Sequence, residues 1–349
     1  MLKPLPAGKL PSWLLRKVLP GSPGDPDILV GPGIGRDAAA IAVGDRVIVA
    51  KNDPITFASE GGATHMVEVN ANDIACMGAR PRWLLVTALL PHGVTPADVL
   101  NQFAELREAC RQRSIELVGG HTEIVPGLSR PILVGMMLGD ASPRELLHPG
   151  RARPGDVLLM TKGLAIEGTA LLARECADEL RERIGEETVH AAVRLLDDPG
   201  ISVVAEAAIA CRSGETTALH DPTEGGMASA VRELATVSGT GVEIDADAIP
   251  VLPETRAVAE ALGIDPLGML ASGSLLIATR ADGASRVLRE LDAAGIPASI
   301  IGRLVEDSEE ASLISGSARR PLPEFAVDEV ARVLSEAADS RSSSSDQRS

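Results

Sequence analysis

Hydrophobic and polar positions recur with two periods along this chain, and the two periods predict a mixture of strands and helices. In the first 140 residues, short apolar runs predict strands at residues 38–43, 46–51, 83–90, 115–118 and 132–138. The Gly44-Asp45 pair between the first two runs predicts a hairpin turn. Helical spacing predicts helices at residues 61–77 and 96–114, and we expect ordered structure to begin near Ile28.

The second half of the chain shows the same alternation. Apolar runs predict strands at residues 157–161, 241–244, 274–279 and 298–301. Amphipathic spacing predicts helices at residues 169–184, 188–197, 202–212, 224–238 and 284–294. Because strands alternate with helices throughout, the predicted fold class is mixed α/β.

Proline and glycine gather between Asp140 and Asp156, which predicts a domain boundary there. A length of 349 residues also favours two domains. The predicted organisation is an N-terminal segment (1–27), a first domain (28–140), a linker (141–156), a second domain (157–316), a C-terminal helix (317–339) and a tail (340–349). The tail is polar and rich in serine, a composition typical of disorder.

Composition and charge narrow the range of partners. The formal net charge of -16 disfavours binding to nucleic acid and to anionic membranes, and aromatic residues, at 1%, leave almost nothing to stack on bases. No apolar run approaches the ~20 residues that span a bilayer, and residues 1–19 lack the apolar core of a signal peptide. The four cysteines form no CxxC pair, so neither a zinc site nor a disulfide framework is predicted. We expect a cytoplasmic protein that binds neither nucleic acid nor membrane.

The first candidate site is the glycine-rich stretch at residues 31–37. Backbone at Gly33 and Gly35 can approach phosphate oxygens closely, and Asp37 can hold Mg²⁺. A plain glycine turn explains the same residues. The stretch is not a Walker A loop, since no Gly-Lys-Ser/Thr follows, and it is not a Rossmann fingerprint, since a strand comes next.

The second candidate lies at the end of the apolar strand expected at residues 46–51. Lys51 and Asp53 stand there, just before Pro54. A carboxylate at a strand end is well placed to reach into a cleft. An Asx turn before the proline is an equally good interpretation.

The third candidate is the helix expected at residues 61–77, which carries Asn70, Asn72 and Asp73 among apolar residues. These three are poor helix formers and need partners when buried, so the pattern favours function over a surface stripe. Asp73 is a candidate metal ligand. Asn70 or Asn72 would bond a ligand or fix its geometry.

A fourth candidate is the stretch from Gly119 to Glu123, which is expected to follow a strand directly. Gly119, Gly120, His121, Thr122 and Glu123 combine adjacent glycines, an imidazole, a hydroxyl and a carboxylate, which suits a polyphosphate or metal site. His121 is also a candidate acid or base. A solvated loop histidine is the alternative.

The fifth candidate, at residues 220–226, lies where a strand passes into a helix. Thr223, Gly225 and Gly226 would bind an anion at the helix start, and Asp221 would be a metal ligand. The alternative is a helix cap formed by Asp221 or Thr223. Weaker candidates are Lys162-Gly163, Glu167-Gly168 and Ser272-Gly273-Ser274.

Five of these stretches, in order, resemble motifs of the aminoimidazole ribonucleotide synthetase superfamily, which includes selenophosphate synthetase, thiamine-monophosphate kinase and HypE-type hydrogenase maturation proteins. The matching residues are 35–39 (GRDAA), Asp53, 71–81 (ANDIACMGARP), 119–123 (GGHTE) and 221–226 (DPTEGG). The resemblance covers roughly residues 9–305. It is strongest to the HypE-type proteins, above all in residues 71–81.

The resemblance implies a PurM-like fold of two α/β domains, with N-terminal sheets that form a barrel in a homodimer. It implies ATP held by glycine-rich segments and Mg²⁺ held by aspartates. The candidate metal ligands are Asp37, Asp53, Asp73 and Asp221. The candidate cofactor-binding residues are Gly33, Gly35, Asn72, Gly119, Gly120, Thr122, Thr223, Gly225 and Gly226. The candidate catalytic residues are Lys51, His121 and Glu123.

The chemistry that the resemblance implies is attack on ATP by an amide or acid oxygen, assisted by metal. We therefore predict a Mg-ATP-dependent enzyme with a small-molecule or carbamoyl-type substrate and a maturation protein as a candidate partner. HypE proteins dehydrate a thiocarbamoyl group on a C-terminal cysteine. The last cysteine here is Cys211, so the carrier thiol is missing, and His121 replaces an acidic residue of the family pattern; both departures count against that specific reaction. The alternative is a non-catalytic maturation or scaffold partner that binds nucleotide without turnover.

Overall fold

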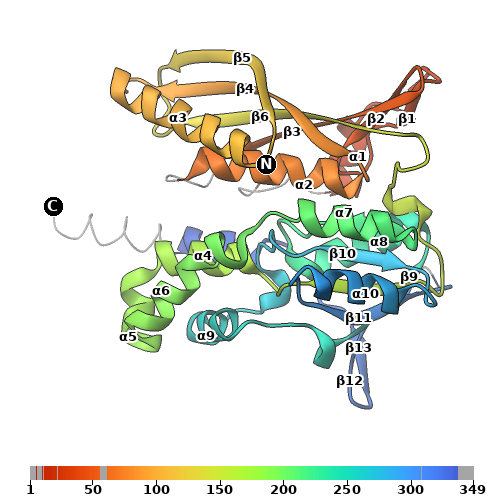
Figure 1. Ribbon diagram of the computed structural model, residues 1–349. Helices are drawn as coiled ribbons and strands as arrows, with labels where there is room; N and C mark the ends of the chain where they lie inside the picture. The colour runs from red at the N-terminus through yellow and green to blue at the C-terminus, as the bar shows by residue number, and fades with distance from the viewer. Residues whose placement is uncertain are drawn as a thin grey trace. The chain divides into compact units, whose positions relative to one another are not determined.

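The computed structural model describes residues 5, 10, 12–21, 23–55, 61–307 and 309–336 of the chain. The chain divides into two compact units (Figure 1). The first unit is Leu19–His148, and the second joins Pro149–Ser349 to Met1–Val18, which includes helix α1 (Ser12–Val18). Each unit is built on one sheet, and the mixed α/β class predicted from the sequence is confirmed.

The first unit has a six-stranded sheet in the order β1-β2-β3-β6-β4-β5. Its strands are β1 (Ile28–Val30), β2 (Ala39–Val43), β3 (Arg46–Ile55), β4 (Arg80–Pro91), β5 (Glu116–Val125) and β6 (Ile132–Ala141). Strands β4 and β5 are parallel, and the other neighbours are antiparallel. Helices α2 (Gly62–Cys76) and α3 (Pro96–Gln112) lie on the same side of this sheet (Figure 1).

Two strands of this sheet are longer than the sequence predicts, and they include residues of motifs that were expected to follow them. Strand β3 continues to Ile55 because Asp53 still pairs with Gly135 of β6. Strand β5 continues to Val125 because His121 pairs with Thr87 of β4. The expectation of a glycine-rich loop after residue 118 is therefore wrong.

Helix α2 is buried along most of its length against the sheet. Two glycines of β6 allow this close approach. A Cβ at Gly135 would clash with Met66, and a Cβ at Gly139 would clash with Ile74, so glycine is needed at both positions. The close approach brings the polar residues of α2 against β3.

Helix α3 fixes α2 through side-chain contacts at two levels. The Glu105 carboxylate accepts hydrogen bonds from the Thr64 N–H (3.1 Å) and hydroxyl (3.2 Å), which satisfies a donor in the first turn of α2. Further along, Arg113 forms an ion pair with the largely buried Glu68. These contacts hold α2 at a defined position on the sheet.

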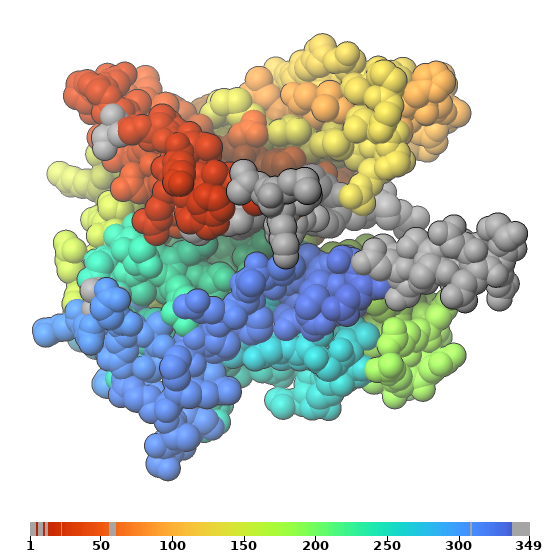
Figure 2. Space-filling view, turned by 180° about the vertical axis from the view of Figure 1, so that it is seen from behind, coloured from red at the N-terminus to blue at the C-terminus, as the bar shows by residue number. Residues whose placement is uncertain are grey.

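The second unit has a seven-stranded sheet in the order β13-β12-β9-β11-β7-β10-β8. Its strands are β7 (Val157–Thr161), β8 (Thr216–His220), β9 (Gly241–Asp245), β10 (Leu276–Thr279), β11 (Ala298–Val305), β12 (Ala311–Ser315) and β13 (Ala318–Pro321). Strands β9 and β12 are parallel, and the other neighbours are antiparallel. The β12–β13 hairpin projects from this unit (Figures 1 and 2).

Helices cover the sheet of the second unit. They are α4 (Ile166–Glu175), α5 (Ala177–Ile184), α6 (Glu186–Arg194), α7 (Val204–Ser213), α8 (Gly226–Ser238), α9 (Pro253–Leu262) and α10 (Ala284–Ala293). Helices α4, α5, α6 and α9 pack together as one group (Figure 1). The main apolar core joins Leu158 and Met160 of β7 to Leu172 of α4 and Met227 of α8.

Two helix predictions for this unit are wrong. The helix expected at residues 169–184 is broken at Cys176 (φ −109°), and the break lets α5 place Leu180 in the core. The helix expected at residues 317–339 begins later, because residues 318–321 form β13 and the described chain is helical only at residues 329–336. Pro321 and Pro323 oppose a helix in the intervening segment. Among the described residues, no helix has the length and apolar character needed to cross a membrane.

Candidate active site

Three of the predicted metal ligands gather around one lysine in the first unit. Lys51 Nζ lies 2.9 Å from Asp73 Oδ2 and 3.4 Å from Asp53 Oδ2. Lys51 and Asp53 are two residues apart on β3 and face α2, which supplies Asp73. Asp37, in the loop between β1 and β2, is close enough to act electrostatically on Lys51. We call these four residues the Lys51 cluster.

The Lys51 cluster has more negative than positive charge, since three carboxylates face one ammonium. The side chains of Lys51 and Asp73 are only 18% and 5% exposed. Burial lowers the pKa of Lys51, but the attraction of Asp73, Asp53 and Asp37 outweighs it, so the pKa of Lys51 is raised above its usual value. Lys51 is therefore charged at neutral pH, and the cluster favours cations.

These residues fit a divalent metal ion. Carboxylate oxygens are the protein ligands that Mg²⁺ prefers. Oxygens of Asp53 and Asp73 already converge on a positive charge, the ammonium of Lys51. The lysine thus marks a place where the fold holds a cation.

Asn70 positions Asp53. The Asn70 Oδ1 accepts a hydrogen bond from the Asp53 N–H at 3.1 Å, and its Nδ2 donates to the carbonyl oxygens of Asp53 (3.3 Å) and Met66 (2.9 Å). Both ends of this fully buried amide are thus used to hold β3 on α2. Asn70 therefore has a positioning role, which is one of the two roles expected for the asparagines of this helix.

The glycine-rich loop that carries Asp37 is an irregular turn. Gly35 has a positive φ of 67°, and the Arg36 side chain donates a hydrogen bond to the Gly31 carbonyl oxygen at 3.2 Å. A Cβ at Gly33 would press against the Arg36 side chain. The loop is therefore a glycine turn that also delivers Asp37 to the Lys51 cluster.

The predicted catalytic residues do not all lie together within one chain. Asp53 of β3 pairs with Gly135 of β6, which pairs with Val86 of β4, which pairs with Gly120 of β5. Strand β5 is therefore three strand spacings from β3, or about 14 Å. The segment that carries His121 and Glu123 therefore lies in the edge strand β5, three strands away from Lys51.

His121 and Glu123 also point to the other face of the sheet. Gly120 is level with Asp53 and shares its face, so the next residue, His121, faces the opposite way. The two side chains are 66% and 60% exposed, with His121 Nε2 3.5 Å from Glu123 Oε2. Thr122 is exposed as well. Within one chain, neither His121 nor Glu123 can act together with Lys51.

The glycines of this motif have a structural role. Gly120 has φ 149°, and a Cβ there would overlap the Val86 carbonyl oxygen of the neighbouring strand. Strand pairing therefore requires glycine at this position. Gly119 lies at an irregularity in the same pairing, where the register shifts between Leu84 and Leu85. The pair suggested a phosphate loop because the sequence does not show this close approach.

In the second unit, two glycines with positive φ, Gly225 (82°) and Gly226 (67°), start helix α8. The helix begins at Gly226, with Gly225 as its N-cap and no side-chain cap. The alternative in which Asp221 or Thr223 caps this helix is therefore wrong. The Thr223 carbonyl oxygen accepts hydrogen bonds from the N–H groups of Gly226 (3.1 Å) and Ala271 (3.2 Å), which holds the turn closed.

Asp328, which was not among the residues predicted from the sequence, secures the same turn. Its Oδ2 accepts the Gly225 N–H at 2.8 Å, and its Oδ1 accepts the Val330 N–H at 2.8 Å at the start of the helical segment 329–336. Burial raises the pKa of Asp328, and these N–H groups oppose that shift. An aspartate before Glu-Val-Ala-Arg-Val-Leu is a helix-start pattern, so its capping role was readable from sequence, but its contact with Gly225 was not.

The remaining candidates of the second unit are also buried. Asp221, directly after β8, is 2% exposed. The neighbouring His220 Nε2 lies 3.2 Å from Glu233 Oε2. Lys162 Nζ lies 2.9 Å from Glu206 Oε1 and donates to the carbonyl oxygens of Ser202 (2.7 Å) and Gly200 (3.1 Å).

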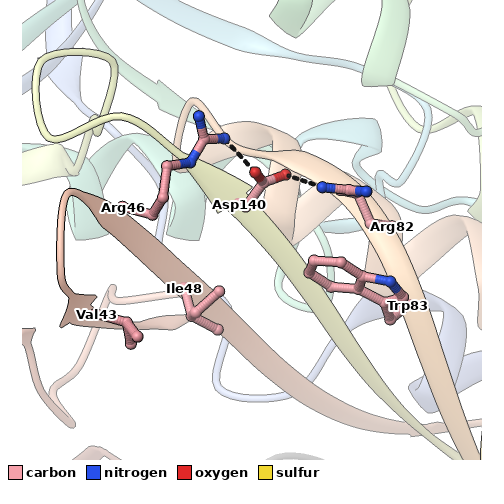
Figure 3. Close-up of a pocket in the computed structure, with 6 residues that line it drawn as sticks. All are labelled: Val43, Arg46, Ile48, Arg82, Trp83 and Asp140. Atoms are coloured by element: carbon pink, nitrogen blue, oxygen red, sulfur yellow. Dashed lines mark hydrogen bonds and ion pairs between the residues drawn. The ribbon is translucent and has the colours of Figure 1, made fainter.

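A separate hollow lies on the face of the first sheet that points away from α2 (Figure 3). It is lined by Val43, Arg46, Ile48, Arg82, Trp83 and Asp140. The Asp140 carboxylate accepts hydrogen bonds from Arg46 and from Arg82, and the Arg82 guanidinium stacks on the Trp83 ring at 4.3 Å. This hollow is distinct from the Lys51 cluster, which faces α2.

Two family models match the chain, one for each unit. The N-terminal domain of AIR synthase related proteins matches residues 35–141, and the C-terminal domain matches residues 153–314. The chain belongs to the AIR synthase related family. The Lys51 cluster lies within the first match, and the turn that starts α8 lies within the second.

Individual relatives agree with this assignment. The carbamoyl dehydratase HypE of Cupriavidus necator is 30% identical over 283 residues, which are 78% of each chain. The structure of HypE in complex with ATP matches with a TM-score of 0.71 at 21% identity, over 93% of this chain and 98% of that one. A chain of the HypE–HypF complex matches with a TM-score of 0.69 at 21% identity, over 82% and 93%. The predicted superfamily, its HypE-like character and the two-domain PurM-like fold are confirmed.

Proposed function

We propose that this protein is an ATP-dependent dehydrating enzyme that uses Mg²⁺ and acts on a carbamoyl-type or other small amide substrate. The observation that carries the proposal is the Lys51 cluster, in which the buried Asp73 and the partly exposed Asp53 converge on one ammonium, in a chain of the AIR synthase related family. Two relatives support it. The protein of Cupriavidus necator is named a carbamoyl dehydratase, and another HypE binds ATP.

The proposed reaction starts with attack of the amide oxygen on the γ-phosphorus of ATP, which breaks the bond to ADP. The phosphorylated oxygen is then a good leaving group. When it departs as phosphate and the nitrogen loses its two protons to base or solvent, a carbon–nitrogen triple bond remains. The sum is amide plus ATP giving nitrile, ADP and inorganic phosphate, so the oxygen removed from the amide ends in phosphate. Charge stabilisation and positioning are the main tasks of an enzyme for such a transfer.

The residues of the Lys51 cluster have distinct proposed roles. Asp53 and Asp73, with Asp37, would hold Mg²⁺, which when bound neutralises charge on the phosphates of ATP. Asn70 fixes the backbone of Asp53, so that carboxylate keeps its place. The burial of Asp73 strengthens its interactions, because water screens them little.

The test is Mg-ATP binding and turnover in wild type and in Asp73→Asn, which keeps the shape of the side chain and removes its charge. We expect Mg-ATP to raise the melting temperature of wild type by mass action. We expect phosphate release with carbamoyl-type amides to fall about 10²–10³-fold in the variant, the size of effect seen when one transition-state contact is lost. Asp45→Asn, in the exposed β2–β3 turn, is the matched control and should behave as wild type.

The proposal fails if Mg-ATP does not stabilise wild type, or if Asp73→Asn responds to Mg-ATP as wild type does. A second candidate function is a maturation partner that binds nucleotide without turnover. It is favoured by the separation of His121 and Glu123 from the Lys51 cluster within one chain. Stabilisation by Mg-ATP without phosphate release for any amide tested supports this second function. Because HypE forms a complex with HypF, a HypF-type protein is the first partner to test.

We also propose that two copies of the chain pair through the face of the first sheet that points away from α2. Ile41, Val43 and Met136 expose apolar side chains on this face, at 36%, 56% and 40%. The hollow of Figure 3 adds guanidinium groups and a carboxylate, so the face has charges of both signs and can complement a copy of itself. An exposed apolar face of this kind is typical of an interface.

Sedimentation of wild type and Met136→Glu tests this pairing. We expect a dimer for wild type and at least about a tenfold weaker association for the variant, because a buried carboxylate without a partner is costly. Leu100→Glu is the matched control, since Leu100 is 66% exposed on α3, which covers the other face. A wild-type monomer, or equal effects of the two substitutions, would contradict the proposed interface.

A further inference from the structure

We propose that Lys51 is a built-in counter-ion, which competes with divalent metal for the carboxylates of Asp53 and Asp73 and thereby makes metal uptake depend on nucleotide. The inference rests on the proposed function only in taking Mg²⁺ as the metal and ATP as the anion. It concerns how the chain behaves before either has bound.

The ammonium of Lys51 contacts the same carboxylate oxygens that would bind a metal ion. Lys51 Nζ is within hydrogen-bonding distance of Asp73 Oδ2 and within ion-pair distance of Asp53 Oδ2. These contacts occupy carboxylate lone pairs that Mg²⁺ would otherwise use. A second cation close to the ammonium would also be repelled by it, and burial of the group weakens the screening of that repulsion.

The backbone under Lys51 cannot move away to relieve this competition. Lys51 pairs with Met137 of β6, and its neighbour Ala50 is the last residue of β3 that pairs with β2. Two residues further on, both backbone polar groups of Asp53 are bonded to Asn70 of α2. The ammonium is therefore tethered to the cluster, and its effective local concentration is far above that of free Mg²⁺.

The side chain, in contrast, can change partners. A lysine has a flexible four-carbon stem and three donors that turn freely. When a metal–nucleotide complex enters, the ammonium can move from the carboxylates to a phosphate oxygen, whose negative charge also attracts it. Free metal offers no such new partner. Metal and nucleotide should therefore bind with positive coupling, and Lys51 is the residue that produces the coupling.

The experiment measures Mn²⁺ binding to nucleotide-free protein, by titration calorimetry and by the electron paramagnetic resonance signal of free Mn²⁺. We expect weak binding to wild type and at least about tenfold tighter binding to Lys51→Met, within the usual range of coupling between sites. We also expect Mn²⁺ to raise the melting temperature of Lys51→Met more than that of wild type. Arg107→Met is the matched control, because it removes one positive charge at an exposed position on α3 and should bind Mn²⁺ as wild type does.

Lys51→Gln provides a second variant with a polar side chain, in case Lys51→Met is unstable without metal. A variant that folds only when Mn²⁺ is added supports the inference, since the metal then replaces the ammonium. Mn²⁺ affinity equal to or below that of wild type overturns it. Failure of both variants to fold even with Mn²⁺ also overturns it, because metal then cannot take the place of Lys51.

These outcomes separate the inference from the proposed function. If Mg-ATP stabilises wild type but neither variant gains Mn²⁺ affinity, the proposed function stands and the role of Lys51 as competitor is wrong. If the variants gain Mn²⁺ affinity but Mg-ATP leaves wild type unchanged, Lys51 is a counter-ion to a metal site that does not serve ATP.

Discussion

Lys51 in the first unit is largely buried and Lys162 in the second is buried, but the chain surrounds them differently. Lys51 faces three carboxylates, and those of Asp53 and Asp73 lie within 3.4 Å. Lys162 has one carboxylate, that of Glu206, and completes its bonds with two backbone carbonyl oxygens. One negative charge balances the positive charge of Lys162, whereas negative charge is in excess around Lys51.

The pKa values of the two lysines move in opposite directions for this reason. Burial lowers the pKa of Lys162, and Glu206 only partly opposes the shift. Around Lys51, burial has the same sign, but the combined carboxylates outweigh it. A buried lysine whose charge is matched and whose three donors are used is part of the structure. A buried lysine among surplus carboxylates marks a site that can still accept cations.

The largest expected effect comes from breaking the balanced pair with Lys162→Met. It leaves Glu206 buried without its partner, and we expect the free energy of unfolding to fall by about 3–5 kcal/mol. The double variant Lys162→Met/Glu206→Leu should recover most of this loss, because both charges are then gone. Urea denaturation measures both. Added Mn²⁺ should stabilise Lys51→Met but not Lys162→Met. A clear stabilisation of Lys162→Met by Mn²⁺ would contradict the conclusion that only Lys51 marks a cation site.

A smaller effect is expected for Asn70→Ala, which tests how firmly the first unit holds its carboxylates. The substitution leaves the backbone N–H and carbonyl of Asp53 without their side-chain partners, which should cost about 1–3 kcal/mol of unfolding free energy. The melting-temperature shift with Mg-ATP should shrink as well, because Asp53 is no longer positioned. Asn101→Ala, at an exposed position on α3, is the control and should change stability by no more than about 0.5 kcal/mol.

The smallest expected effect is on the pH dependence of stability, and it concerns Glu243 of the second unit, which forms ion pairs with Arg303 and Arg319. Hydrogen bonds from Arg319 and Arg303, which outweigh burial, hold the pKa of Glu243 below its usual range. A lowered folded-state pKa means that the unfolded chain binds more protons on acidification, so this contribution is present above about pH 4.5 and is lost as the pH falls through the folded-state pKa.

Stability measured by denaturation between pH 6 and pH 3 tests this sign. Wild type should lose more stability on acidification than Glu243→Gln, which has no carboxyl group to protonate. Glu260→Gln, at an exposed position on α9, should follow wild type. If Glu243→Gln and wild type lose stability equally, the contacts of Glu243 with arginine do not favour its charged form.

Features that depend on local pattern and local chemistry could be predicted from the sequence. The hairpin at Gly44-Asp45 follows from turn chemistry, and both flanking runs are strands of the sheet. Asp73 was singled out because a polar residue in an apolar helix needs a partner, and the structure provides Lys51. The order of motifs also indicated the family, which the matches to both units establish.

The failures have a common physical reason, which is contact between segments far apart in the chain. Residues 119–123 have the composition of a phosphate loop, yet β4 holds them in a strand. Gly120 is needed because of the carbonyl oxygen of Val86, and no local feature reveals this. Asp328 reaches Gly225 across 103 residues of sequence, so only its local capping role could be predicted.

By itself, the sequence determined the types of the main elements, the order of the motifs and the presence of costly polar residues within apolar segments. These properties depend on side-chain periodicity and on neighbours within a few residues. Only the tertiary structure decided which carboxylates share one ammonium and which face of a sheet each residue occupies. Strand register and the packing of α2 on glycines of β6 decide this, and both depend on long-range contacts that are absent from local pattern.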